Sequence, residues 1–149
     1  MVIKLPLCPS VNEYLMPANN RLIKTSIARA FEDRINRIKK VPSHRTLFEE
    51  ATRIFTGRFL RVDTYYVFLK SRIIGKKNQI KVIDYLNRQK ISFDCLSLCI
   101  EIDDKYFKSG FHELILCDSD EEQCIIFNIT VQESIRSLSD LRKELLLKL

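Results

Sequence analysis

Two adjacent carboxylates are the residues best suited by type and position to metal-assisted chemistry. Asp103 and Asp104 follow directly after the apolar run 96–102. Carboxylate oxygens are preferred ligands of Mg²⁺, and such a pair can place one side chain on the ion and the other in solvent or behind it. The pair is therefore a candidate magnesium site. The alternative is that two acids simply open a polar loop after a buried segment.

The cysteine and histidine residues do not form a recognisable reactive group. The five cysteines include no CxxC pair, and the two histidines are far in sequence from Cys95 and Cys99. This favours reduced, mostly buried thiols over a structural zinc site, and an intracellular protein. His112 and Cys117 would lie on opposite faces of a strand, which argues against a catalytic pair. The sequence also lacks the GxSxG, P-loop and GxGxxG motifs.

The charge of the chain is divided between its two parts. Residues 1–90 contain 19 Lys and Arg against 7 Asp and Glu, whereas residues 91–149 contain 6 against 12. The basic part peaks between residues 70 and 90, and the acidic part at residues 101–104 and 118–122. A basic surface of this kind favours an anionic partner such as a phosphate backbone.

Hydrophobic periodicity predicts the elements that must position these residues. The predicted elements are a strand at 2–7, a loop at 10–20, a strand at 21–24, a helix at 27–40 capped by Thr25 or Ser26, a helix at 44–55, a strand at 59–69 and a helix at 79–90 capped by Asn78. Two antiparallel strands follow at 111–117 and 124–131, joined by the acidic turn 118–123. A final helix is expected from 132 or 134 to the end, with Leu138, Leu141, Leu145 and Leu146 on its packing face.

These elements predict one α+β domain over residues 1–149. We expect a small mixed or antiparallel sheet with helices packed mainly on one face. No apolar stretch reaches the length of a membrane span, and the first residues do not form a signal peptide. The expected location is therefore intracellular, in the cytoplasm, or in the nucleus if the source is eukaryotic or viral, with no membrane partner.

The N-terminal third contains a recognisable signature. A short strand leads into Pro9-Ser10, Asn12 and Tyr14, and a basic strand at 21–24 and a basic helix beginning at Ser26 follow. This order resembles the RusA family of Holliday-junction resolvases, small homodimeric Mg²⁺-dependent endonucleases of phage type that cut branched DNA. The family signature is Pro-Ser-x-Asn-x-Tyr followed by the same two basic elements.

The central family signature is only partly present. It reads Asp-x-Asp-Asn-x-x-Lys, and the matching window 75–81 keeps Asn78 and Lys81 but has Gly75 and Lys77 in place of the aspartates. Asp103-Asp104 fits the position of a later acidic pair in the family. The resemblance covers residues 3–131 and leaves out the segment 44–55 and the C-terminal helix at 132–149.

The resemblance implies a DNA partner, branched or duplex, and a homodimer. The implied nucleic-acid-binding residues are Arg21, Lys24, Arg29, Lys76, Lys77, Asn78 and Lys81. Because two metal-binding acids are missing and Lys77 would repel Mg²⁺ at close range, we expect DNA binding without metal-dependent cleavage and without a cofactor.

Two alternatives stay open at this point. The first is an active structure-selective endonuclease with a rearranged site, in which Asp103 and Asp104 hold Mg²⁺ and act in catalysis together with Lys81. The second is a viral or phage protein-interaction module that acts on a host protein. Its docking element would be the acidic tract 118–122 or the C-terminal helix.

Overall fold

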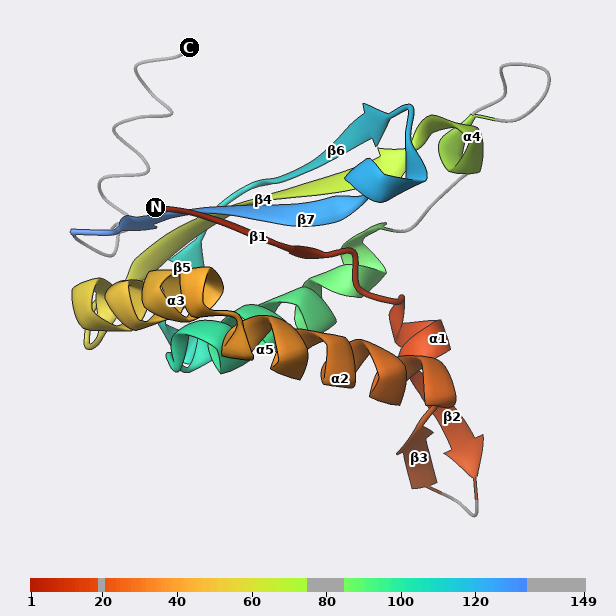
Figure 1. The fold of residues 1–149 in the computed structure, drawn as a ribbon, viewed down its shortest axis with the longest axis horizontal. Coiled ribbons are helices and arrows are strands. Elements are labelled where there is room, and N and C mark those ends of the chain that lie inside the picture. The colour runs from red at the N-terminus through yellow and green to blue at the C-terminus, as the bar shows by residue number, and fades with distance from the viewer. Residues whose placement is uncertain (19–20, 75–84, 134–149) are drawn as a thin grey trace, which may run out of the picture.

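A mixed five-stranded sheet carries the helices α2, α3 and α5 together on one of its faces (Figure 1). The computed structural model describes residues 1–18, 21–74 and 85–133. Its strands are β1 (Val2–Pro6), β2 (Leu15–Ala18), β3 (Arg21–Lys24), β4 (Leu60–Leu69), β5 (Phe107–Ser109), β6 (His112–Cys117) and β7 (Cys124–Val131). Its helices are α1 (Val11–Tyr14), α2 (Ser26–Lys40), α3 (Pro42–Phe55), α4 (Lys70–Ile73) and α5 (Gln89–Ile100), with short 3₁₀ turns η1 (Tyr85–Arg88), η2 (Asp104–Tyr106) and η3 (Asp120–Glu122). The predicted α+β class is confirmed.

The strand β4 is the centre of the sheet. It pairs antiparallel with β7 on one side, and β7 pairs antiparallel with β1. On its other side β4 pairs in parallel with both β5 and β6. Alternate side chains of β4 are fully or almost fully buried against the helices, namely Leu60, Val62, Thr64, Tyr66 and Phe68. The strands predicted at 2–7, 21–24 and 59–69 are therefore confirmed.

The last two strands are present but do not pair with each other as predicted. Both lie beside β4, on opposite sides, so that β4 is inserted between them. The linking residues do not form a tight hairpin turn, because Ser119 and Glu122 make a reciprocal capping box that produces the 3₁₀ turn η3. The Gln123 side chain then accepts a hydrogen bond from the Leu69 amide at 3.3 Å, which fixes this connection across the end of β4.

The two long helices follow from their sequence patterns. Thr25 caps α2 by accepting a hydrogen bond from the Ala28 amide at 3.1 Å, and Ala28, Phe31 and Ile35 bury one side of the helix. Pro42 occupies the first position of α3, where its missing amide hydrogen costs nothing. The predicted helices at 27–40 and 44–55 are thus confirmed, and α3 begins two residues earlier.

Two predicted segments differ from the structure, and a third falls mostly on residues that the structure does not describe. The expected loop at 10–20 contains α1, capped by Ser10, and the strand β2, which pairs with β3. The sequence predicts a helix at 79–90, but residues 79–84 lie outside the described residues and 85–88 form a 3₁₀ turn. The helix in this region begins at Gln89 and continues to Ile100. Residues 132–133 follow β7 without helical structure, and the rest of the predicted C-terminal helix lies outside the described residues. In the described part of the chain, no helix is long and apolar enough to cross a membrane.

Candidate nucleic-acid interface

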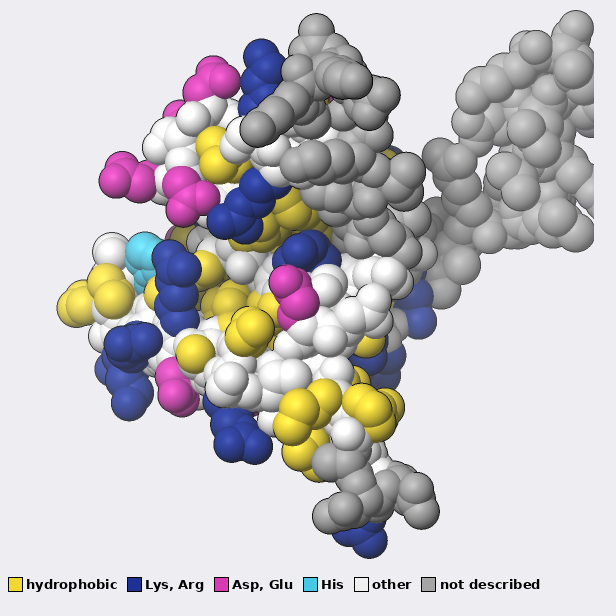
Figure 2. Space-filling model, turned by 90° about the vertical axis from the view of Figure 1, so that its right-hand side faces the viewer, with side chains coloured by type: hydrophobic (Ala, Val, Ile, Leu, Met, Phe, Trp, Pro, Cys, Tyr) yellow, Lys and Arg dark blue, Asp and Glu magenta, His cyan; other side chains and the backbone are white. Residues whose placement is uncertain are grey.

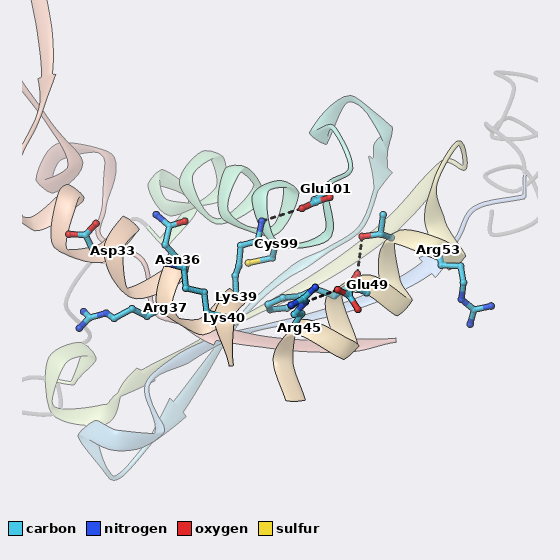
Figure 3. A pocket seen from close by; sticks show the side chains of 12 residues that line it. Asp33, Asn36, Arg37, Lys39, Lys40, Arg45, Glu49, Arg53, Cys99 and Glu101 are labelled. Atoms are coloured by element: carbon cyan, nitrogen blue, oxygen red, sulfur yellow. Dashed lines mark hydrogen bonds and ion pairs between the residues drawn. The ribbon is translucent and has the colours of Figure 1, made fainter. Parts of the chain in front are cut away.

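An open groove of about 1280 Å³ lies between α2, α3 and the C-terminal end of α5 (Figure 3). We call it the helical groove. The residues that line it are Asp33, Asn36, Arg37, Lys39, Lys40, Arg45, Phe48, Glu49, Thr52, Arg53, Cys99 and Glu101. The groove arises because Val41 ends α2 and also precedes the first residue of α3, so the two helices change direction at a single residue. Phe48 and Cys99 are buried and belong to the core beneath the groove.

The walls of the helical groove are tied to the end of α5. The Lys39 ammonium group of α2 donates a hydrogen bond to the Leu98 carbonyl oxygen at 2.7 Å. The Thr52 hydroxyl of α3 donates to the Ile100 carbonyl oxygen at 2.6 Å. These contacts satisfy carbonyl groups that a helix end otherwise leaves unpaired, and a cation there also complements the helix dipole. The three helices are therefore held in one arrangement.

The charges of the helical groove fall into paired and unpaired groups. Arg45 lies 2.8 Å from Glu49, and Lys39 lies 3.5 Å from Glu101. Three further cations, Arg37, Lys40 and Arg53, are exposed and form no ion pair with any described residue, and the Asp33 carboxylate likewise has none. Figure 3 shows Arg37 and Arg53 at opposite ends of the groove, with the two ion pairs between them. The groove thus has an excess of unpaired positive charge.

The predicted residues Arg21, Lys24 and Arg29 lie on the hairpin β2–β3 and at the beginning of α2. The hairpin projects from the body of the protein (Figure 1). Lys24 donates to the Glu32 carboxylate at 2.5 Å, and the Tyr14 hydroxyl donates to the same oxygen. Burial acts to raise the pKa of Glu32, but these two hydrogen bonds outweigh it and lower the pKa. Lys24 is therefore partly neutralised, whereas Arg21 forms no ion pair within the described chain.

A second hollow of about 590 Å³ lies between α2, η1 and η3. Two of its arginines are paired, because Arg72 lies 3.3 Å from Asp120 and Arg88 lies 3.5 Å from Glu13. Figure 2, which shows this side of the molecule, has basic and acidic side chains next to each other around hydrophobic atoms. The second hollow is therefore nearly balanced in charge, unlike the helical groove.

The acidic pair predicted to bind a metal ion lies outside the helical groove. Asp103 caps η2, and its carboxylate accepts from the Lys105 amide at 2.9 Å and lies 3.0 Å from the Lys105 ammonium group. The backbone hydrogen bond from Lys105, followed by that from its side chain, lowers the pKa of Asp103. Asp104 lies 3.3 Å from the ammonium group of Lys90. Each predicted metal ligand thus has a lysine as its partner.

No group of three or more His, Cys, Asp or Glu side chains with suitable geometry occurs in residues 1–18, 21–74 and 85–133. The remaining predicted residues, Lys76, Lys77, Asn78 and Lys81, lie outside the described residues.

The thiols are placed as the sequence suggested. Cys8, Cys95, Cys99 and Cys124 are buried, and Cys117 is half-buried. Burial raises the pKa of Cys8 and of Cys99 to about 12, so both are protonated at neutral pH and are poor nucleophiles. The four buried cysteines therefore act as small apolar residues of the interior.

Within the described part of the chain, none of the nucleic-acid-binding residues named from the sequence lines the helical groove. Its cations on α2 lie on the predicted basic helix, whereas nothing in the sequence interpretation anticipated Arg45 and Arg53 of α3. The segment 44–55 lay outside the recognised signatures, and its apolar side was used only to predict a helix. The signal that identifies them is spacing, since Arg45, Glu49 and Arg53 recur every four residues and so share one face of α3.

The comparisons with protein families and with curated proteins add nothing to the description of the site. No protein-family model matches the chain, and no curated protein matches it.

Proposed function

We propose that the protein binds DNA with the helical groove and the adjoining exposed side of α2. The observation that carries the proposal is that Arg37, Lys40 and Arg53 line one groove and form no ion pair among the described residues. Cations without protein partners are the groups that neutralise phosphates and release counterions from DNA. Arg adds a planar fork that matches the geometry of a phosphate.

The basic surface continues along α2 toward the hairpin. Arg29 lies on the exposed side of α2 and donates to the Lys24 carbonyl oxygen at 3.2 Å, which places it beside the base of the hairpin. The rise of about 1.5 Å per residue puts Arg29 and Lys40 about 16 Å apart along the helix. The surface therefore extends over several phosphates, as DNA binding requires.

The proposal is for DNA binding without cleavage, and the positions of the two predicted metal ligands support it. Asp103 and Asp104 are each paired with a lysine and neither lines the helical groove. The first DNA to test is a four-way junction, because the N-terminal signature resembles that of the junction-cutting RusA family. A plain duplex serves as the comparison.

The test is fluorescence anisotropy with labelled junction and duplex across a salt titration. The variant Arg29→Ala/Arg37→Ala/Lys40→Ala should lose at least tenfold in affinity at low salt. Each lost phosphate contact lowers the salt slope by about 0.9, so the slope should fall by roughly 2 to 3.

The matched control is Lys4→Ala/Arg58→Ala/Lys108→Ala, which removes the same charge from exposed positions outside the helical groove. Its affinity should stay within about threefold of the unmodified protein, because only general electrostatic attraction is reduced. Equal losses in the two variants, or no binding by the unmodified protein at low salt, would overturn the proposal.

A further inference from the structure

We infer that the helical groove receives a single strand of DNA and not a duplex. This inference rests on the proposed DNA binding and names the class of DNA that its groove takes. The strand would be a single-stranded segment, such as one that leaves a duplex at a branch or an end.

The dimensions of the groove favour one strand. It is bounded by helices in mutual contact, and the axes of packed helices lie about 8–10 Å apart. A furrow on the surface of two packed helices is no wider than this axis spacing, whereas the major groove of a B-form duplex alone is about 12 Å wide, so a whole duplex cannot enter the furrow. At about 1280 Å³ the groove is also larger than the range typical of pockets for one small ligand, which fits an extended chain better than a single small molecule.

The charges lie along the direction that such a strand would follow. Arg37 and Arg53 occupy the two ends of the groove in Figure 3, and Arg45 lies between them on α3. Arg45 and Arg53 are separated by eight residues, about 12 Å along the helix. A strand that crosses the groove can therefore place successive phosphates against α2 first and α3 afterwards.

The guanidinium groups also provide surfaces for bases. Single-stranded DNA is held by a basic groove together with planar groups on which bases stack, and arginine can take that role. Phe48 and Cys99 are buried beneath the groove and expose little surface. Stacking would thus depend on arginine, which recognises every base alike, and we expect little sequence preference.

Glu49 is the residue that opposes a strand in this groove. Its ion pair with Arg45 is exposed, with side-chain exposures of 64% and 71%, and exposed pairs contribute little to stability. Arg45 can therefore turn toward a phosphate at small cost, while the Glu49 carboxylate would repel that phosphate. Removal of the Glu49 charge should consequently strengthen binding of the strand.

Two substitutions on α3 test the inference, each with a neighbour as its control. Arg53→Ala should weaken binding of a single-stranded oligonucleotide about tenfold, and Glu49→Gln should strengthen it severalfold, while duplex affinity stays within twofold in both. Arg58→Ala and Glu50→Gln change the same charges at exposed positions that do not line the groove, and both should leave single-strand affinity within twofold. Circular dichroism of each variant checks that it is folded.

The outcomes separate this inference from the proposed function. If the triple variant on α2 loses duplex binding but Arg53→Ala leaves single-strand affinity unchanged, the single-strand inference is wrong and DNA binding stands. If Arg53→Ala weakens single strand and duplex equally, the groove does not discriminate and the inference is again wrong. If the unmodified protein binds no DNA at low salt, both proposals are wrong.

Discussion

The ammonium group of Lys90 lies 3.3 Å from the carboxylate of Asp104. The same ammonium group lies 2.7 Å from the carboxylate of Asp94 in the first turns of α5. The hydrogen bond to Asp94, and then that to Asp104, raises the pKa of Lys90, so the lysine stays charged between two acids. The acid that the sequence suggested as a metal ligand therefore has a fixed cation as its neighbour.

We expect Asp104→Asn to leave DNA binding intact. Asp104 is outside the helical groove, so junction affinity should stay within about twofold of the unmodified protein. A four-way junction incubated with Mg²⁺ or Mn²⁺ should remain uncut by either protein, as read on a denaturing gel. Metal-dependent cleavage that disappears in Asp104→Asn would instead favour the endonuclease alternative.

The local elements of the fold could be predicted because their causes are local. Ala28, Phe31 and Ile35 repeat at helical spacing behind a capping threonine, and that pattern is sufficient for α2. The strand β4 is rich in β-branched and aromatic residues, which fit the pleated and partly buried surface of a sheet.

Long-range arrangement could not be read in the same way. The sequence of β6 and β7 is equally compatible with a hairpin and with the observed insertion of β4 between them, because strand pairing depends on partners distant in the chain. The helical groove was missed for a similar reason. Its cations come from α2 and α3, and only the change of direction at Val41 brings them around one space.

Gly110 should tolerate no side chain. It joins β5 to β6 with φ of +148°, and a Cβ atom there would lie 2.0 Å from the Val62 carbonyl oxygen. Gly110→Ala must therefore shift β4 or the link between β5 and β6, and we expect the free energy of unfolding to fall by about 2–3 kcal/mol. Urea denaturation followed by circular dichroism measures this change.

Gly57→Ala is the control for backbone strain alone. Gly57 also has a positive φ of +73°, but no atom lies within 4 Å of its added Cβ. Its cost should be about 1 kcal/mol, the penalty of a left-handed conformation without a clash. A loss at Gly110 no larger than that at Gly57 would contradict the steric explanation.

His112 should make the free energy of unfolding decrease as the pH falls below about 6.5. Its ring lies 5.9 Å from that of Phe93, and its buried Nδ1 atom has no hydrogen-bond partner among the described residues. Burial lowers its pKa below the ordinary 6.5, partly opposed by Asp63. A lowered pKa favours the neutral form in the folded state. The stabilisation is thus complete above about pH 6.5 and is lost as the pH falls toward the lower, folded value.

The variant His112→Phe should show a smaller loss of stability from pH 7 to pH 5 in urea denaturation, because the titrating ring is gone. His44→Phe replaces the other histidine, on α3, and should keep the full loss. A pH dependence that is the same in both variants would assign it to the carboxylates instead.

Substitutions of Lys39 and Lys40 should show that one lysine stabilises the fold around the helical groove and that the other binds DNA. Lys39 is only 25% exposed, donates to the Leu98 carbonyl oxygen and is paired with Glu101, whereas Lys40 is exposed and unpaired among the described residues. Lys39→Met removes a cation from the end of α5 and should cost about 1 kcal/mol of unfolding free energy. Lys40→Met should change stability by less than about 0.5 kcal/mol.

The same two variants should affect DNA binding in the reverse order. Both remove one positive charge from adjacent positions of α2, so a difference between them cannot come from net charge. Lys40→Met should weaken binding of a single-stranded oligonucleotide about threefold to tenfold and reduce the salt slope by about 0.7, because Lys40 is available to a phosphate. Lys39→Met should leave the affinity and the salt slope nearly unchanged, because the Lys39 ammonium group already contacts Glu101 and the Leu98 carbonyl oxygen at the end of α5. Equal losses of affinity in the two variants would show that freedom from protein partners does not decide which cations contact DNA.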